Sequence, residues 1–90
     1  MGDVVMRFYM RFSALDRPGV LSRISGILGK NEISISAVIQ KGRKINGAVP
    51  IVMMTHEAKE ENLHRALREI DRLNVILGKT IFIRVENELE

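Results

Sequence analysis

One segment of the chain combines the residue types that can hold a small zwitterion. It reads Asp-Arg-Pro-Gly-Val-Leu from Asp16 to Leu21, between a predicted strand and a predicted helix. The free N–H groups and the dipole at a helix start suit a carboxylate, and Gly19 has no Cβ to block its approach. Asp16 can then pair with an ammonium group. The competing interpretation is that Asp16 only stabilises the helix start and that Gly19 only relieves crowding.

The other reactive residue types are not grouped as catalysis or metal binding requires. His56 and His64 are separated in the sequence and lack a second ligand pair at metal-binding spacing. The chain has no cysteine, so it contains neither a thiolate nucleophile nor a disulfide. We interpret Glu57, Glu60 and Glu61 as complements to the dipole at a helix start. We therefore expect no catalytic residue, no metal and no cofactor.

The size and composition of the chain predict a single folded domain, residues 1–90, with a core from about residue 6 to residue 86. Ninety residues are too few for a second hydrophobic core, and a lone domain of this size is marginally stable, which favours an oligomer or attachment to a larger protein. No apolar run is long enough to span a membrane. The net charge is +3, and we interpret the basic cluster Lys41, Arg43 and Lys44 as a solvated hairpin loop. We expect a cytoplasmic protein with neither a membrane nor a nucleic acid as its partner.

The first half of the chain predicts a strand, a helix and a second strand. Residues 6–13 alternate, with Met6, Phe8, Met10 and Phe12 on the core face. A turn over residues 14–17 then leads to a helix whose first residue we expect to be Pro18. The apolar stripe of this helix includes Val20, Ile24, Ile27 and Leu28, and Gly29 to Asn31 form a stop signal. Residues 33–40 alternate again, with Ile33, Ile35, Ala37 and Ile39 on one face and Ser34, Ser36, Val38 and Gln40 on the other.

The second half predicts a strand, a helix and a last strand. Residues 48–56 are apolar on both faces, residues 59–73 carry a helical apolar stripe, and Ile81, Ile83 and Val85 share one face of a strand over residues 80–85. The resulting βαββαβ order predicts an α+β protein. We expect a ferredoxin-like sandwich in which a four-stranded antiparallel sheet carries two helices on one face.

The uncovered face of this sheet is expected to carry an apolar patch made of Tyr9, Val38, Phe82 and the outward residues of the third strand. Such patches usually mark an interface. RNA-recognition domains share the βαββαβ order, and Tyr9 lies between Arg7 and Arg11 as a stacking residue would. The third strand has no aromatic residue, however, so half of the stacking platform is missing. This makes RNA binding the weaker hypothesis.

The Asp16–Leu21 segment, placed between a strand and a helix, resembles the signature of the ACT domain. Asn-Glu-Ile-Ser-Ile from Asn31 to Ile35 resembles the second landmark of that family, the entry to its second strand. A narrower resemblance, to the carboxy-terminal ACT domains of homoserine dehydrogenases, rests on residues 36–42, 48–52, 55–57 and 76–79. The catalytic domains of those NAD(P)-dependent oxidoreductases are absent from this chain, so the resemblance implies a regulatory domain, not an enzyme.

The resemblance implies feedback sensing by paired domains. ACT domains often pair side by side and bind an amino acid at the seam; for homoserine dehydrogenase the effector is threonine. Carried over by position, the ligand-binding residues are Asp16, Arg17, Gly19, Val20 and Leu21, together with Ser34 from the neighbouring subunit of a homodimer or higher oligomer. Asp16 would hold the amino group. Ala14 departs from relatives that place a polar ligand contact there, which leaves open a dimerisation module that binds no ligand.

Overall fold

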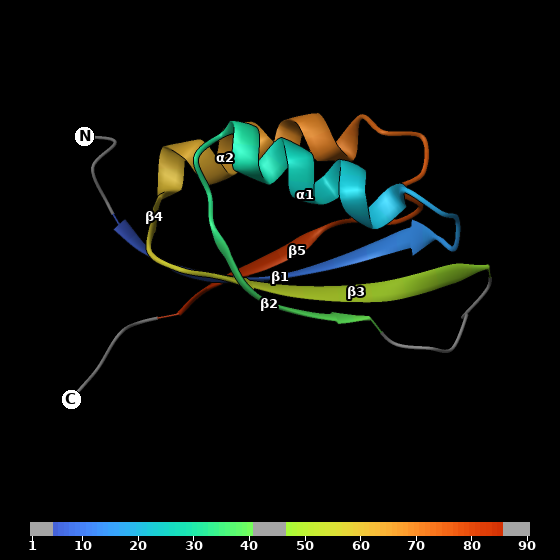
Figure 1. Cartoon of the computed structure of the whole chain (residues 1–90), viewed down its shortest axis with the longest axis horizontal. Coiled ribbons are helices and arrows are strands. Elements are labelled where there is room, and N and C mark those ends of the chain that lie inside the picture. Colours follow the sequence, from blue (N-terminus) through green and yellow to red (C-terminus); the bar gives the residue numbers. More distant parts are fainter. Residues whose placement is uncertain (1–4, 41–46, 86–90) are drawn as a thin grey trace.

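The computed structural model describes residues 5–40 and 47–85 of the chain, and its fold is the predicted α+β sandwich. Its elements in chain order are β1 (Val5–Leu15), α1 (Val20–Lys30), β2 (Ile35–Gln40), β3 (Ala48–Thr55), β4 (Ala58–Lys59), α2 (Glu60–Asp71) and β5 (Ile81–Val85). Both helices lie on the same side of the sheet (Figure 1). The ferredoxin-like arrangement is thereby confirmed, with the two-residue β4 as an unpredicted addition. The predicted basic loop at Lys41, Arg43 and Lys44 lies outside the described residues.

The sheet is built around β1. This strand pairs with β3 on one side and with β5 on the other, and β2 pairs with the far side of β3; every pairing is antiparallel. The short β4 pairs with the first two residues of β1. β2 and β5 are therefore the outer strands of the four-stranded part of the sheet, and their outer edges face away from the other described strands.

The core lies between the sheet and the helices, as the periodicities predict. Phe8, Met10 and Phe12 of β1 are completely buried. The helices cover them with two apolar stripes, Val20, Ile24 and Leu28 from α1 and Leu63, Ala66, Leu67 and Ile70 from α2. Burying one such large side chain contributes about 1.5–3 kcal/mol. This packing fixes the orientation of α1 on the sheet and hence the position of the start of α1.

Two predicted boundaries around the turn are wrong. β1 continues through Ala14 and Leu15, because both residues pair with β3 and the Leu15 N–H donates to the Val75 carbonyl at 2.8 Å. α1 begins at Val20 and not at Pro18, because Gly19, which caps the helix, has a φ of 87°. A left-handed residue cannot be part of a right-handed helix, so Pro18 belongs to the turn.

A β-bulge reverses the predicted faces of β2. Ile35 pairs with Thr55, but Ala37 pairs with Met54, so the register shifts between them. An extra residue in one strand turns all later side chains to the opposite face. Val38 and Gln40 consequently lie on the helix side of the sheet, and Ala37 and Ile39 lie on the uncovered side.

The predicted faces of β5 also need correction. Phe82 pairs with Met10 and therefore faces the helices, whereas Ile83 and Ile81 pair with Tyr9 and Arg11 and face away from them. The Phe82 ring meets the Phe8 ring edge to face at 6.3 Å between centroids. Because Ile81, Phe82 and Ile83 are all apolar, the sequence pattern does not identify the core face of this strand.

Candidate functional site

A cavity of about 390 Å³ lies where β1 ends and α1 begins. It is lined by Leu15, Asp16, Arg17, Pro18, Gly19, Val20, Leu21, Gln40 and Ile51. Small-molecule sites typically measure about 300–1,000 Å³. The lining includes Asp16, Arg17, Gly19, Val20 and Leu21, so the structure brings together every site residue predicted within the Asp16–Leu21 segment.

The start of α1 presents backbone N–H groups that the described part of the chain leaves without a backbone acceptor. The N–H of Val20 donates to the Arg17 carbonyl at 3.3 Å, and the N–H of Arg23 donates to the Gly19 carbonyl at 3.0 Å. Between them, the N–H groups of Leu21 and Ser22 have no backbone acceptor among the described residues. The first turn of α1 contains no acidic residue, and its cap residue, Gly19, has no side chain that could bond to these N–H groups. This end of the helix is therefore suited to an external anion.

The competing interpretation of Gly19, that it only relieves crowding, does not fit this geometry. Gly19 occupies the cap position of α1 and has no side chain that could form a capping hydrogen bond. A Cβ added to Gly19 would meet nothing within 4 Å, so this glycine does not relieve crowding. Its φ of 87° is the reason for a glycine here, because other L-residues rarely adopt that conformation.

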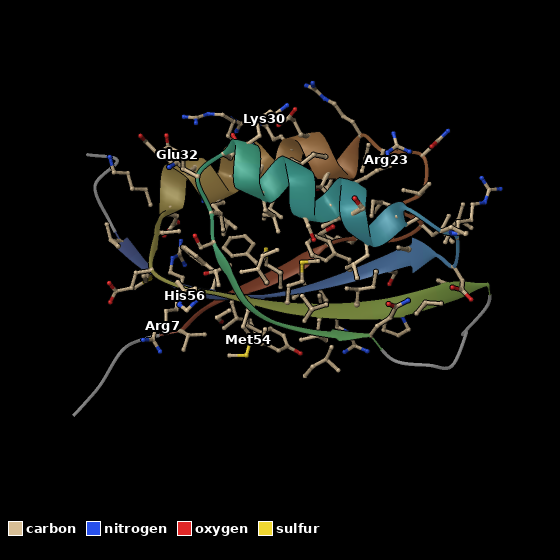
Figure 2. All side chains as sticks on the ribbon, in the orientation of Figure 1. Arg7, Arg23, Lys30, Glu32, Met54 and His56 are labelled. Carbon is tan, nitrogen blue, oxygen red and sulfur yellow. The ribbon has the colours of Figure 1, made fainter. Side chains whose placement is uncertain are left out.

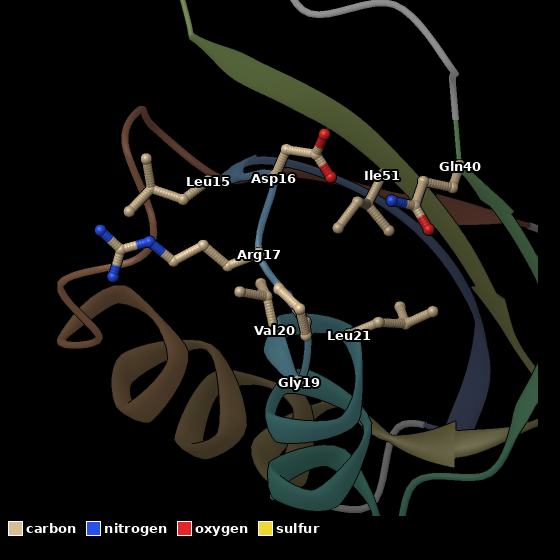
Figure 3. Close-up of a pocket in the computed structure, with 9 residues that line it drawn as sticks. Leu15, Asp16, Arg17, Gly19, Val20, Leu21, Gln40 and Ile51 are labelled. Carbon is tan, nitrogen blue, oxygen red and sulfur yellow. The ribbon is translucent and has the colours of Figure 1, made fainter.

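Two polar side chains from different elements face the same space. Asp16, which follows β1, and Gln40, the last residue of β2, project toward each other with Ile51 of β3 between them (Figure 3). The guanidinium of Arg17 extends away from both of them (Figure 3). Asp16 supplies a carboxylate and Gln40 supplies an amide that can donate and accept hydrogen bonds. Sequence reasoning missed Gln40, because plain alternation assigned it to the other face of the sheet.

The apolar side of the cavity is continuous with the core. Val20 and Ile51 are 4% and 2% exposed, respectively. Leu15 and Leu21 are half-buried next to them. Carbon atoms of a ligand would therefore contact side chains that are already fixed by the packing of α1 on the sheet. The site combines a helix start whose N–H groups lack backbone acceptors among the described residues, a carboxylate, an amide and an apolar wall.

Ser34 and Ala14 lie away from this cavity. Ser34 is exposed just before β2, about 20 Å of extended chain from Gln40 at the other end of that strand. Its carbonyl accepts a hydrogen bond from the His56 N–H at 2.9 Å. Ala14 is completely buried and is not among the residues that line the cavity. A polar side chain at position 14 would accordingly point into the core and not into the cavity.

The histidines take part in other interactions. The His64 ring contacts Glu60 at 3.1 Å and meets the Phe82 ring edge to face at 5.3 Å. Within residues 5–40 and 47–85, no three His, Cys, Asp or Glu side chains are grouped so that they could hold a metal ion. The cavity at the start of α1 is thus the best candidate site on the described surface.

Comparison with known proteins agrees with the fold. The ACT domain family model matches residues 8–75, which include most of β1, the Asp16–Leu21 segment and both helices. This chain belongs to the ACT domain family. The ACT domain from a GTP pyrophosphokinase of Chlorobium tepidum has the same fold, with a TM-score of 0.66 over 91% of this chain and 100% of that chain at 13% identity.

Among ACT domains, this chain is similar to the regulatory part of homoserine dehydrogenases. It is 37% identical over 87 residues to homoserine dehydrogenase from Methylobacillus glycogenes, covering 96% of this chain and 21% of that protein. Homoserine dehydrogenase from Pseudomonas aeruginosa is 34% identical over 80 residues, covering 88% of this chain and 18% of that protein. The solved structure of a homoserine dehydrogenase from Thiobacillus denitrificans superposes with a TM-score of 0.85 at 37% identity, over 96% of this chain and 19% of that one.

The chain spans about a fifth of the length of these relatives. What it shares with them is an ACT regulatory domain. None of the helices in the described residues is long and apolar enough to cross a membrane.

Proposed function

We propose that this ACT domain senses a small amino acid, with threonine as the first candidate, in the cavity at the start of α1. The observation that carries the proposal is the combination, in one cavity, of a carboxylate and helix N–H groups that have no backbone acceptor among the described residues. The N–H groups of Leu21 and Ser22 would donate hydrogen bonds to the ligand carboxylate, and Asp16 would pair with the ligand ammonium group. These two features are complementary to the two charges that every amino acid carries.

The remaining lining favours a short side chain with one polar group. The methyl group of threonine would pack on Val20 and Ile51, which are fixed by the core. The threonine hydroxyl would form a hydrogen bond with the side-chain amide of Gln40, which projects toward the cavity (Figure 3). A lysine side chain would bring a second positive charge beside an apolar wall, which is unfavourable.

The proposal includes a second subunit paired along β2. The outer edge of β2 carries exposed residues from Ser36 to Gln40. If two β2 strands paired in an antiparallel manner around Ala37, Ser34 of the partner subunit would lie opposite Gln40 and thus next to the cavity. A ligand touching both subunits favours one arrangement of them, with a coupling of typically about 1–3 kcal/mol. In a longer homoserine dehydrogenase-like protein, this coupling would alter the activity of the catalytic domains. We propose that the protein acts in the cytoplasm, as expected from the sequence.

Isothermal titration calorimetry tests the proposal. Threonine, serine, isoleucine, methionine and lysine are each titrated into the wild-type chain, Asp16→Ala and the matched control Glu61→Ala, which removes an exposed carboxylate from the first turn of α2. We expect threonine to give the largest heat with the wild type and the control, and none with Asp16→Ala. If no amino acid gives heat at millimolar concentration while the chain is dimeric, the chain is instead a dimerisation module. Ala14, the residue that favoured this alternative, is completely buried and does not line the cavity, which supports the sensing proposal.

A further inference from the structure

The side of the sheet that faces away from the helices is apolar and basic. In strand order it carries Met54 and Val52 of β3, Tyr9 and Arg11 of β1, and Ile83 and Ile81 of β5; we call these six residues the open face. Ile81 is 51% exposed, Ile83 55% and Met54 37%. Met54 and Arg7 lie on the side of the sheet opposite the helices (Figure 2). Met54 on β3 and Ile81 and Ile83 on β5 flank Tyr9 and Arg11 of the central strand β1, and three large apolar side chains this exposed form a patch of the kind that marks an interface.

The charges on this side of the sheet have one sign. Arg7 and Arg11 project from β1, and none of the residues of β1, β2, β3 and β5 that face this way is acidic. Neither arginine has an ion pair within the described residues. A partner that binds the open face must therefore be apolar where it contacts Met54, Ile81 and Ile83. It must also place a group without positive charge against Arg11.

A second copy of this chain meets both requirements in one orientation. Two sheets packed face to face can be related by a two-fold axis that lies between them. In the orientation considered, this axis is perpendicular to the strands and crosses β1 at Met10. This axis places each residue paired with Tyr9 opposite a residue paired with Arg11. Met54 then faces Val52 of the partner subunit, and Ile83 faces Ile81 of the partner subunit. Two-fold interfaces are self-complementary in this way.

The same axis separates the arginines. Arg11 lies over the ring of the partner's Tyr9, where a guanidinium is attracted to the aromatic face, and Arg7 lies over the partner's Ser13. By contrast, an axis parallel to β1 would place Arg11 opposite the partner's Arg11, and two like charges would repel each other. We infer that the open face is an interface between two copies of this chain, related by the axis across the strands.

This interface is independent of the proposed ligand site. The cavity lies at the start of α1 and the end of β2, whereas the open face is on the opposite side of the sheet. Pairing along the β2 edge and packing through the open face use different surfaces. They can therefore operate together, and an assembly that uses both has twice the mass of an assembly that uses the β2 edge alone.

Sedimentation equilibrium of the 90-residue chain tests the inference by charge exchange. Tyr9→Arg would place an arginine opposite the partner's Arg11, so we expect half the wild-type mass at equal concentration. The double variant Tyr9→Arg with Arg11→Glu would restore attraction across the axis, and we expect it to regain the wild-type mass. Arg68→Glu on the exposed surface of α2 is the matched charge-reversal control and should retain the wild-type mass.

Two further measurements separate the possible failures. Ile83→Glu should halve the mass of the assembly without a change in the circular dichroism spectrum. This variant tests the same interface if the variants at position 9 do not fold. Amino-acid binding heat should be the same in Ile83→Glu and in the wild type, so loss of assembly is distinguished from loss of the ligand site. The inference is overturned if folded Tyr9→Arg and Ile83→Glu keep the wild-type mass, or if the double variant stays at half mass. A monomeric wild type that binds single-stranded RNA through Tyr9 would also overturn it.

Discussion

Glu60, the first residue of α2, is held by the guanidinium of Arg84 in β5. Arg84 donates from Nε to one carboxylate oxygen at 2.7 Å and from Nη2 to the other. These hydrogen bonds, followed by that from His64, lower the pKa of the Glu60 carboxyl from about 4.5 to about 2. The Arg84 side chain also lies 6.0 Å from the centre of the Phe82 ring. This cluster joins the outer strand β5 to the helix layer.

The lowered pKa of Glu60 predicts how stability depends on pH. The folded state binds the proton of Glu60 less tightly than the unfolded state does, so its contribution is complete above about pH 5 and is lost as the pH falls toward 2. We expect Glu60→Gln to be less stable than the wild type at pH 7 and the difference to shrink over this range. Urea unfolding of both proteins at several pH values measures it. Glu61→Gln, from the same turn but outside the cluster, should show no such convergence.

The conformation of Gly19 predicts opposite effects for two glycine substitutions. Gly19→Ala forces a Cβ into a left-handed conformation and should lower the free energy of unfolding by about 1–2 kcal/mol. Gly26 lies inside α1 with open space around its Cβ position, so Gly26→Ala should raise the free energy of unfolding by up to about 1 kcal/mol. Chemical denaturation of the two variants checks this. Equal effects of the two substitutions would contradict the left-handed cap.

The position of Gln40 predicts how much this residue contributes to the binding free energy of threonine, given the proposed function. Gln40→Ala removes one uncharged hydrogen bond to the ligand hydroxyl, so threonine should bind with about 1 kcal/mol less free energy, roughly a fivefold higher Kd. Val38→Ala is the matched control, because Val38 faces the same side of β2 but does not line the cavity. Titration calorimetry compares the variants. An unchanged Kd in Gln40→Ala would place the ligand hydroxyl elsewhere.

We expect replacement of Asn31, at the end of α1, to lower the free energy of unfolding more than replacement of its charged neighbour Lys30. The buried Asn31 amide donates to the Ile27 carbonyl at 2.9 Å and to the Glu69 carboxylate at 3.1 Å, thereby joining α1 to α2. Asn31→Ala should cost about 1–2 kcal/mol. Lys30→Ala breaks an exposed ion pair with the same Glu69 and should cost less, because water screens exposed charges. Thermal unfolding of the two variants gives the order of the effects, and the reverse order would contradict this account.

The sequence by itself determined the order of the elements and the core faces of β1, α1 and α2. The alternation around Phe8 and Phe12 and the helical stripe around Ile24 each extend over enough residues for the period to be unambiguous, and local periodicity reflects which face is buried. The Asp16–Leu21 segment was also readable, because its polar and glycine residues are contiguous between two clear elements. Five of the six predicted site residues lie in this segment and line one cavity.

Only the tertiary structure decided which side chains of β2 and β5 face the helices. Ile81, Phe82 and Ile83 are all apolar, so the pairing of Phe82 with Met10, and not hydrophobicity, assigns it to the core face. In β2, the bulge after Ile35 reverses the alternation and turns Gln40 toward the cavity. A bulge is defined by the partner strand, and a short strand has too few residues for its period to reveal one. The second polar side chain of the site thus depended on strand pairing, whereas Asp16 could be read from the sequence.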